Sequence, residues 1–248
     1  MMRIGWMFPD ILGLNGDRGN ILAIERYLKI VGIDFRVNRI SYEDEKSFNP
    51  FDYDLLYFGT GEISSFNQII KWLSKYNIKE YIDAGKIIIS TGTTSALFTK
   101  KIVRDDKSEI EALGIINTAA IEKEYVYGDD EYYKAIYNKK ELEIIGNQIQ
   151  LIDYDTKDTP KENIFGELIY GYGNNGDDNG TGFIFKNSLF LNTLGPVLAL
   201  NPWLTIEIIK LTSGQNDVKL DFPLQEKSFK SRKKFIMNKE AHIKDWRK

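Results

Sequence analysis

The chain has 248 residues, of which 42 % are hydrophobic, and a formal net charge of −3 at pH 7. This length allows one α/β domain or two small ones, with enough apolar residues for a sizeable core. The slightly acidic balance does not favour nucleic-acid binding, and no apolar run approaches the roughly 18 residues that a membrane span needs. The beginning, "MMRIGWMFPD", predicts a first strand rather than a signal peptide, so we expect a cytoplasmic protein without a membrane span.

Cysteine is absent, and the single histidine, His242, lies near the C-terminus. The lack of cysteine excludes disulfides, thiolate metal sites and cysteine nucleophiles. The position of the histidine excludes a Ser–His pair in the body of the fold and any multi-histidine metal site. We expect neither a metal nor a cofactor.

The first hundred residues alternate between predicted strands and predicted helices. Strands are expected at four places: 2–8, 35–40, 55–58 and 87–90. Helices are expected at three places: about 21–31, 65–74 and 79–84. Gly32 and Gly85 are expected to end the first and the third of these helices. Strands that alternate with helices predict a parallel sheet with right-handed crossovers.

The pattern changes in the second half of the chain. From about Tyr125 to Thr193 the segments are short, alternating and rich in Tyr, Ile and Gly, which predicts antiparallel or mixed strands. The segment "NNGDDNG", Asn174–Gly180, is expected to be a loop, and Pro202 opens a further predicted helix, "PWLTIEIIKL". No repeat and no clear linker interrupts this part, so we expect one domain followed by a tail.

The tail is strongly basic. Between Glu226 and Lys248 there are nine Lys and Arg against three acidic residues, a net charge of +6, which leaves −9 for the rest. The pattern is typical of a solvated terminal helix or tail, and alternatively of a docking arm for an acidic partner. We expect the domain to span residues 1–212 and the basic segment residues 213–248.

The stretch "KIIISTGTTSALF", Lys86–Phe98, has the strand–turn–helix order of a nucleophile elbow. Its apex falls on Gly92, which has no side chain and adopts a positive φ without penalty. Five hydroxyls flank the apex: Ser90, Thr91, Thr93, Thr94 and Ser95. Since no histidine is nearby, a substitute nucleophile would need a Lys or carboxylate base. The alternatives are that the hydroxyls cap the helix or that the turn holds an anion.

Four segments together resemble the class I, or triad, glutamine amidotransferases. They are Phe8–Ile33 with "NGDRGN", Tyr53–Glu62 ending in "GTGE", the elbow, and the run from "GYGNNGDDNGTG" to "LFLNTLGPVLALNPWL". The resemblance covers roughly residues 1–212. It is closest to the cobyric-acid-synthase-like branch and, within it, to the amidotransferase subunit of lipid II isoglutaminyl synthase. It implies a flavodoxin-like α/β fold: a mostly parallel sheet flanked by helices, with additional antiparallel strands in the second half.

The resemblance also implies which residues stand at the family's catalytic positions. The nucleophilic cysteine of the family falls on Gly92, and its base histidine falls on Leu194. The oxyanion loop, G-G-G in the family, becomes Gly59-Thr60-Gly61. The G-F-E-N-H-G-G-R-T segment beside the family's active site becomes "GNQIQLIDYDT". Losses at four separate places imply relaxed selection on hydrolysis.

Two loop elements of the family are retained. In "NGDRGN", Asp17 is expected to cap the following helix and Arg18 to form a surface ion pair. Alternatively Asp17, Arg18 and Asn20 frame the glutamine pocket or a partner contact. In "GYGNNGDDNG", Gly173, Asn174 and Asn175 form either a loop at the active-site rim or a flexible turn. This loop lacks the ordered carboxylate spacing of a calcium site.

Family members of this kind release ammonia from glutamine for a Mur-ligase-like partner, which amidates the peptidoglycan precursor. The resemblance therefore predicts a subunit that binds a Mur-ligase-like protein without hydrolysing glutamine. Two alternatives remain: an active amidotransferase or hydrolase with an unrecognised residue set, and a sensor that binds glutamine or an anion in the old pocket.

Overall fold

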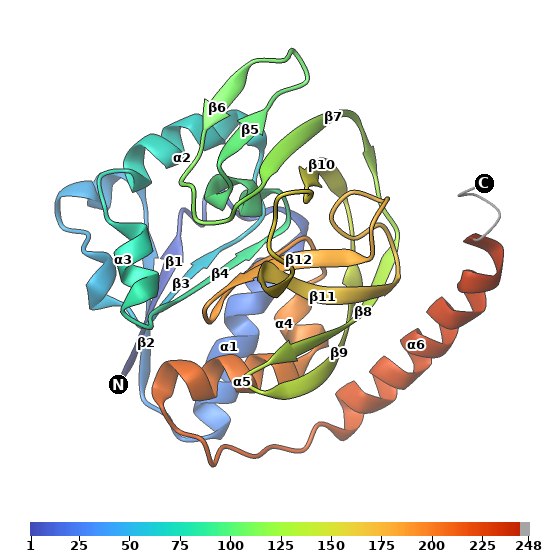
Figure 1. Ribbon diagram of the computed structural model, residues 1–248. Coiled ribbons are helices and arrows are strands. Elements are labelled where there is room, and N and C mark those ends of the chain that lie inside the picture. The colour runs from blue at the N-terminus through green and yellow to red at the C-terminus, as the bar shows by residue number, and fades with distance from the viewer. Residues whose placement is uncertain (244–248) are drawn as a thin grey trace.

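The computed structural model describes residues 1–243, with side chains described up to residue 239 (Figure 1). Its centre is a nine-stranded sheet with the order β2-β1-β3-β4-β13-β12-β11-β8-β9. The first five strands in this order are parallel: β1 (Met2–Met7), β2 (Phe35–Ile40), β3 (Leu55–Phe58), β4 (Ile87–Thr91) and β13 (Ser188–Leu191). The α/β class is thereby confirmed.

The second half of the chain extends this sheet with antiparallel strands, as the alternating pattern predicts. They are β8 (Asp130–Tyr137), β9 (Lys140–Asn147), β11 (Ile164–Tyr170) and β12 (Gly180–Phe185). A second, four-stranded sheet has the order β10-β7-β5-β6. Its strands are β5 (Lys101–Val103), β6 (Glu109–Glu111), β7 (Ala119–Tyr127) and β10 (Gln150–Asp155). The fold therefore combines the parallel strands of the first half with antiparallel strands from the second half.

Helices cover both faces of the parallel strands (Figure 1). On one face lie α2 (Phe66–Leu73), α3 (Ile78–Asp83) and the second sheet. On the other lie α1 (Arg18–Ile30), α4 (Val197–Leu200) and α5 (Pro202–Ser213). Because both faces are covered, β3 and β4 are buried along their whole length, which explains their continuous apolar runs.

Short 3₁₀ segments lie in several of the connections. They are η1 (Leu14–Gly16), η2 (Tyr42–Lys46), η3 (Pro50–Asp52), η4 (Ile63–Ser65), η5 (Gly92–Phe98) and η6 (Lys161–Asn163). The strands expected at 35–40 and 55–58 are confirmed, as are the glycine ends of two helices, where Gly32 has φ +71° and Gly85 φ +85°. The α-helix expected after strand 87–90 is instead the tighter η5.

The last helix, α6 (Pro223–Ile243), lies against β8, β9 and β11 rather than standing free (Figure 1). Ile236 is fully buried there, and Phe229 meets Trp203 edge-on with a ring-centroid distance of 4.9 Å. Three basic side chains of α6 pair with acids of the same chain: Arg232 with Asp130, Lys233 with Glu143, and Lys239 with Asp129 and Asp130. Part of the tail's positive charge is therefore neutralised within the molecule.

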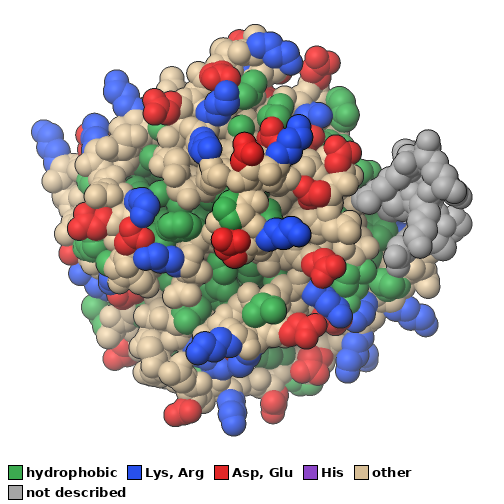
Figure 2. Space-filling view, in the orientation of Figure 1, with side chains coloured by type: hydrophobic (Ala, Val, Ile, Leu, Met, Phe, Trp, Pro, Cys, Tyr) green, Lys and Arg blue, Asp and Glu red, His purple; other side chains and the backbone are tan. Residues whose placement is uncertain are grey.

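Charged side chains of both signs are interspersed over the face shown in Figure 2. No helix within residues 1–243 is long and apolar enough to cross a membrane. The histidine at position 242 falls in α6, and its side chain lies outside the described residues.

Candidate functional site

The elbow keeps its backbone shape. Thr91 ends β4, and Gly92 opens η5 with φ +62°, the left-handed conformation expected at the apex. This conformation is costly for residues with a Cβ atom and free for glycine. Gly92 is also buried. The geometry of a strand-to-helix elbow is thus present without a side chain at its tip.

The structure brings Gly92, Leu194 and Thr60 together, although they lie far apart in the sequence. A Cβ atom built on Gly92 would lie 2.4 Å from Thr60 Oγ1 and 2.8 Å from Leu194 Cδ2. Leu194 is only 1 % exposed, and Thr60 is 2 % exposed. The volume that a nucleophilic side chain would need at position 92 is therefore filled by these two residues.

The loop Gly59-Thr60-Gly61 is tied down by hydrogen bonds and close contacts. The backbone N–H of Thr60 donates to Asp17 Oδ2, and Thr60 Oγ1 donates to the carbonyl oxygen of Thr91 at 3.1 Å. A Cβ atom on Gly59 would come within 2.4 Å of the Leu12 carbonyl oxygen, so only glycine fits there. Since Asp17 occupies the Thr60 N–H, this group is not free to stabilise an oxyanion.

Asp17 is buried, with 1 % exposure, and burial raises the pKa of its carboxyl group, while hydrogen bonds from Thr60 act in the opposite direction. The expectation that its side chain caps α1 is wrong, because the carboxylate turns instead toward Thr60. The expected ion pair of Arg18 is also wrong: this side chain is exposed and has no ion pair among the described residues.

Asn20 links the "NGDRGN" loop to the rest of the site. Its Nδ2 donates to the hydroxyl of Tyr57 at 2.7 Å, and its Oδ1 accepts from the backbone N–H of Leu198 at 2.8 Å. Burial and the nearby Asp17 carboxylate raise the pKa of Tyr57 well above its ordinary value, so its hydroxyl stays protonated. The loop thus joins β3 and α4 by buried hydrogen bonds.

The elbow hydroxyls do not cap the helix, so that expectation is wrong. They face neighbouring strands and loops: Thr91 Oγ1 donates to the Phe58 carbonyl at 3.4 Å, Thr93 Oγ1 to the Gly61 carbonyl at 2.5 Å, and Ser95 Oγ to the Leu191 carbonyl at 3.2 Å. Thr94 Oγ1 is buried without a hydrogen-bond partner among the described residues. The Thr91 hydroxyl also lies close to the Asp17 carboxylate, whereas the hydroxyls of Thr93 and Ser95 donate to backbone carbonyls.

The "GYGNNGDDNG" loop is anchored, and the interpretation of a flexible turn is wrong for its first residues. Asn174 is fully buried, and its Oδ1 accepts from the Gly182 N–H at 2.9 Å and from Asn192 Nδ2 at 2.8 Å. The carbonyl of Gly173 accepts from Gln148 Nε2 at 2.9 Å. Asn175 Nδ2 donates to Asp178 Oδ2 at 3.0 Å.

One buried acid was missed by the sequence-based analysis. Glu131 on β8 is fully buried and accepts hydrogen bonds from the hydroxyls of Thr181 and Thr193, the latter at 2.6 Å. Burial raises the pKa of this carboxyl to about 7, although the two hydroxyls act in the opposite direction. Its alternation with Tyr133 and Ala135 was the signal, because a period of two places all three on one face of the strand.

A cleft of about 460 Å³ opens beside Leu194, the residue predicted at the family's base position. Its lining comes from four segments: Asn15 in η1, the Gly128–Asp130 stretch, the Asn147–Ile149 stretch, and Leu194 with Gly195. A separate cavity of about 10 Å³, the size of one water molecule, adjoins Gly92, Tyr154 and Asn192. The cleft is large enough for a small ligand, whereas the cavity at the apex is not.

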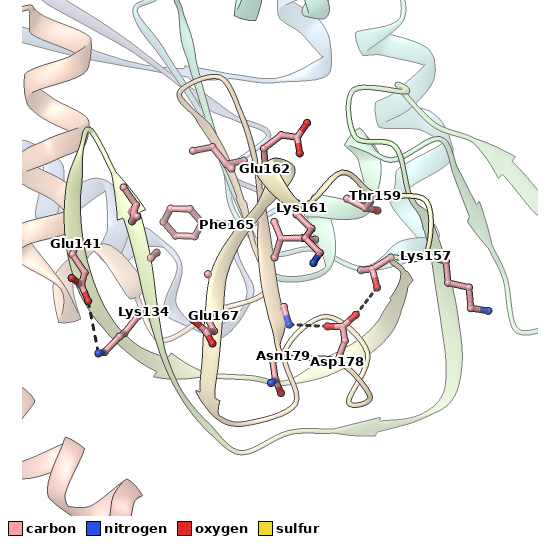
Figure 3. A pocket seen from close by; sticks show the side chains of 17 residues that line it. Lys134, Glu141, Lys157, Thr159, Lys161, Glu162, Phe165, Glu167, Asp178 and Asn179 are labelled. Carbon is pink, nitrogen blue, oxygen red and sulfur yellow. Dashed lines mark hydrogen bonds and ion pairs between the residues drawn. The ribbon is translucent and has the colours of Figure 1, made fainter.

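A larger open groove of about 1150 Å³ lies elsewhere, over β8, β11 and the following loops (Figure 3). Lys134 turns toward Glu141 there, with a nitrogen–oxygen distance of 3.8 Å, and Asp178 accepts from the hydroxyl of Thr156. Neither Gly92 nor Leu194 lines this groove. No group of three metal-ligating side chains gathers within the part of the chain that the structure describes.

No family model matches the chain. Its sequence is 23 % identical over 212 residues to a Streptococcus pneumoniae protein described as "Lipid II isoglutaminyl synthase (glutamine-hydrolyzing) subunit GatD", covering 84 % of this chain and 79 % of the relative. The Staphylococcus aureus protein of the same description is 26 % identical over 200 residues, covering 77 % of this chain and 76 % of the relative. The chain is a distant homologue of GatD.

One solved structure is similar to this chain in fold. The glutaminase domain of Trypanosoma brucei CTPS, with bound acivicin, superposes with a TM-score of 0.50 at 9 % identity, covering 88 % of this chain and 96 % of that domain. The similarity to GatD is in sequence, and the similarity to the glutaminase domain is in fold. Both agree with the amidotransferase resemblance seen in the sequence.

Proposed function

We propose that this chain is a degenerate amidotransferase-like subunit that does not hydrolyse glutamine and instead binds and organises a Mur-ligase-like partner. The observation that carries the proposal is the packing at Gly92. Thr60 Oγ1 and Leu194 Cδ2 stand 2.4 Å and 2.8 Å from where a Cβ atom would lie, so the nucleophile is missing and its space is filled.

Glutamine hydrolysis in this class needs a nucleophile that attacks the amide carbon and a base that moves the proton. Gly92 and Leu194 can supply neither group. The Thr60 N–H, which lies in the former oxyanion loop, is already bonded to Asp17. The Asp17 carboxylate is buried, and the hydroxyls of Thr60 and Thr93 donate to the carbonyl oxygens of Thr91 and Gly61.

The relatives support a role in a complex. Both are described as a subunit of lipid II isoglutaminyl synthase. We propose by analogy that the present chain assembles in the cytoplasm with the ligase-type subunit of such a synthase. Retention of the "NGDRGN" and "GYGNNG" loops, both anchored by buried hydrogen bonds, fits a scaffold that kept its shape after it lost its chemistry.

A glutaminase assay tests the proposal. The purified chain, alone and with its ligase-type partner, is incubated with glutamine, and glutamate is measured, with Staphylococcus aureus GatD and its own partner as the positive control. We expect no turnover. Turnover of about 1 s⁻¹, an ordinary enzyme rate, would refute the proposal and favour a hydrolase with another residue set. The double variant Gly92→Cys, Leu194→His is expected to recover little activity, because Thr60 still crowds position 92.

The cleft beside Leu194 favours a second candidate function, binding of glutamine or an anion as a signal. Its volume of about 460 Å³ falls within the usual range for small-ligand pockets. Thermal unfolding of the isolated chain with and without 10 mM glutamine or phosphate tests this alternative, since a ligand that binds only the folded state raises the melting temperature.

A further inference from the structure

The last helix, α6, is attached to the sheet by few apolar contacts. Among its side chains that the structure describes, only that of Ile236 is fully buried, in a small cluster with Tyr132, Ile145 and Tyr170. The helix follows the segment 214–222, which contains neither helix nor strand (Figure 1). An element that buries so little apolar surface belongs to the least stable part of a fold, which opens before the core does.

Ion pairs supply a further part of the attachment, and they are open to solvent. Arg232 pairs with Asp130 at 2.9 Å, and Lys239 pairs with Asp129 at 2.8 Å and with Asp130 at 2.9 Å. The side chains of Arg232 and Lys239 are 26 % and 34 % exposed. The distance over which such charges act falls from about 10 Å at 0.1 M salt to about 3 Å at 1 M. The attachment of α6 therefore weakens as the ionic strength rises.

Arg232 joins the ends of two neighbouring strands. Asp130 of β8 and Asn147 of β9 form the last registered pair at this end of the two strands. Arg232 Nη2 lies 2.9 Å from Asp130 Oδ1, 2.8 Å from Asn147 Oδ1 and 3.2 Å from the carbonyl oxygen of Gly146. Asn147 Nδ2 also donates to Asp130 Oδ1, at 3.3 Å. The guanidinium of α6 thus closes the end of the β8–β9 pair.

Asn147 connects this end of β9 to the segment that closes over Gly92. The N–H of Leu194 donates to the carbonyl of Asn147 at 2.8 Å, and the N–H of Asn147 donates to the carbonyl of Leu194 at 3.2 Å. Leu194 Cδ2 in turn lies 2.8 Å from where a Cβ atom of Gly92 would be. Asn147, Leu194 and both aspartates bonded by α6 line the same cleft. A chain of contacts therefore runs from Arg232 to the apex of the elbow.

The other contacts of β9 limit how far a movement of α6 can spread. The N–H of Ile145 donates to Asn201 Oδ1 at 2.9 Å, and Asn201 Nδ2 donates to the carbonyl of Ile145 at 2.8 Å. Asn201 precedes α5 and does not depend on α6 for these two bonds. We therefore expect β9 to stay in place up to Ile145 when α6 leaves, and only the residues from Gly146 onward to loosen.

We propose that α6 is a releasable strap, which holds the Leu194 segment closed over Gly92 when it is docked and loosens that segment when it leaves the sheet. Release also takes the cationic partners Arg232 and Lys239 away from Asp129 and Asp130, so the open cleft has an acidic wall. The inference goes beyond the subunit role and needs no partner protein, since the strap and the site belong to one chain.

Amide hydrogen exchange of the full chain, followed residue by residue by NMR, tests the strap. The rates are compared at about 50 mM and about 1 M NaCl, where screening differs most. We expect the amides of Ile236 in α6 and of Leu194 to exchange at least about 10-fold faster at high salt. The amides of Ile145 and of Ile89, which lies in the buried strand β4, are expected to change by less than about 2-fold.

Two variants that each remove one positive charge of α6 sharpen the test. Arg232→Gln loses the bonds to β8 and β9, so Leu194 is expected to exchange at least about 10-fold faster already at low salt. Lys230→Gln is the control, because Lys230 is exposed and has no ion pair among the described residues. Its exchange rates are expected to stay within about 2-fold of the wild type.

Three results would overturn the inference. Faster exchange in α6 with an unchanged Leu194 amide would show that the helix leaves without loosening the segment. Exchange of Ile236 only together with Ile89 would show that α6 opens only when the whole domain unfolds. Unchanged rates in α6 at high salt would show that its docking does not depend on the ion pairs. If Arg232→Gln also loses protection at Ile89, that variant is not folded, and the salt series of the wild type decides.

Discussion

Replacing Gly92 with alanine tests whether the space at the apex of the elbow is filled. The substitution adds one methyl group at φ +62°, where it would meet Thr60 Oγ1 at 2.4 Å and Leu194 Cδ2 at 2.8 Å. The left-handed backbone costs a residue with a Cβ atom about 1–2 kcal/mol. Overpacking a filled site costs about 1–3 kcal/mol more. We therefore expect Gly92→Ala to lower the free energy of unfolding by about 2–5 kcal/mol.

A matched control separates the two contributions. Gly32 has a similar φ of +71°, but a Cβ atom there would have no neighbour within 4 Å. Gly32→Ala is thus expected to cost only the backbone term of about 1–2 kcal/mol. Both variants are measured by urea unfolding, and the slope of free energy against urea must stay the same for the comparison to hold. Equal losses for the two variants would refute the argument that Thr60 and Leu194 fill the site.

A double-mutant cycle identifies the crowding partner. Leu194→Ala alone is expected to lower the free energy of unfolding by about 2–5 kcal/mol, because the Leu194 side chain is only 1 % exposed and its removal leaves a buried cavity. In the Gly92→Ala background the same change relieves the overlap, so the combined loss is expected to be smaller than the sum by about 1 kcal/mol or more. Simple additivity would show that the two positions do not interact.

Three further predictions follow from the buried groups. The pKa of Glu131 rises from 4.5 to about 7 on folding, so its contribution to the free energy of unfolding is fully present below pH 4.5 and is lost as the pH rises through 7. Urea unfolding from pH 4 to 9 is expected to show a loss of stability on the order of 3 kcal/mol that is absent in Glu131→Gln. Equal pH profiles for the two proteins would contradict the assignment. Arg232→Ala removes hydrogen bonds to Asp130, Gly146 and Asn147, so we expect the free energy of unfolding to fall by about 1–2 kcal/mol. Trp203 fluorescence is expected to change as α6 loosens, because Trp203 packs against Phe229 of that helix. Lys230→Ala, at an exposed position of α6, is the control and is expected to change neither readout. Asn174→Ala leaves the buried N–H of Gly182 without its acceptor, while Asn192 Nδ2 keeps its bond to the Gly173 carbonyl, so we expect a cost of about 1–3 kcal/mol by thermal unfolding. The exposed Asn179→Ala, in the same loop, is expected to cost less than about 0.5 kcal/mol.

Local pattern was sufficient to predict the parallel half of the fold. The strand 55–58 matches the structure because its apolar run is short, bounded by a polar residue and a glycine, and buried on both faces. The strand 35–40 matches as the partly exposed edge strand of the sheet, where only Ile40 is buried. The elbow at Gly92 could also be predicted from the sequence, since a strand, a glycine and an apolar run follow one another there. The short strands β5 and β6 were missed, because three residues are too few to show a period.

Side-chain partners were less predictable than elements. Asp17 lies at the start of α1 as expected, but its carboxylate bonds to Thr60, which is 43 residues away in the sequence. The spacing along the chain predicts that the Asp17 carboxylate accepts from a nearby N–H at the start of α1. It cannot show that the N–H of a residue far away in the sequence competes for the same carboxylate oxygen. The hydroxyls of the elbow were misassigned for the same reason, because their acceptors belong to other strands.

Composition and motif order establish which chemistry this chain lacks: it has no cysteine, and its one histidine is at position 242. The resemblance to the amidotransferases predicts glycine and leucine at the two positions where that family carries its reacting groups. Only the tertiary structure shows that Thr60 and Leu194 close over Gly92 and that α6 pairs with acids of its own sheet. The reason is physical: residue types limit which reactions are possible, whereas contacts between distant segments are set by how the whole chain packs.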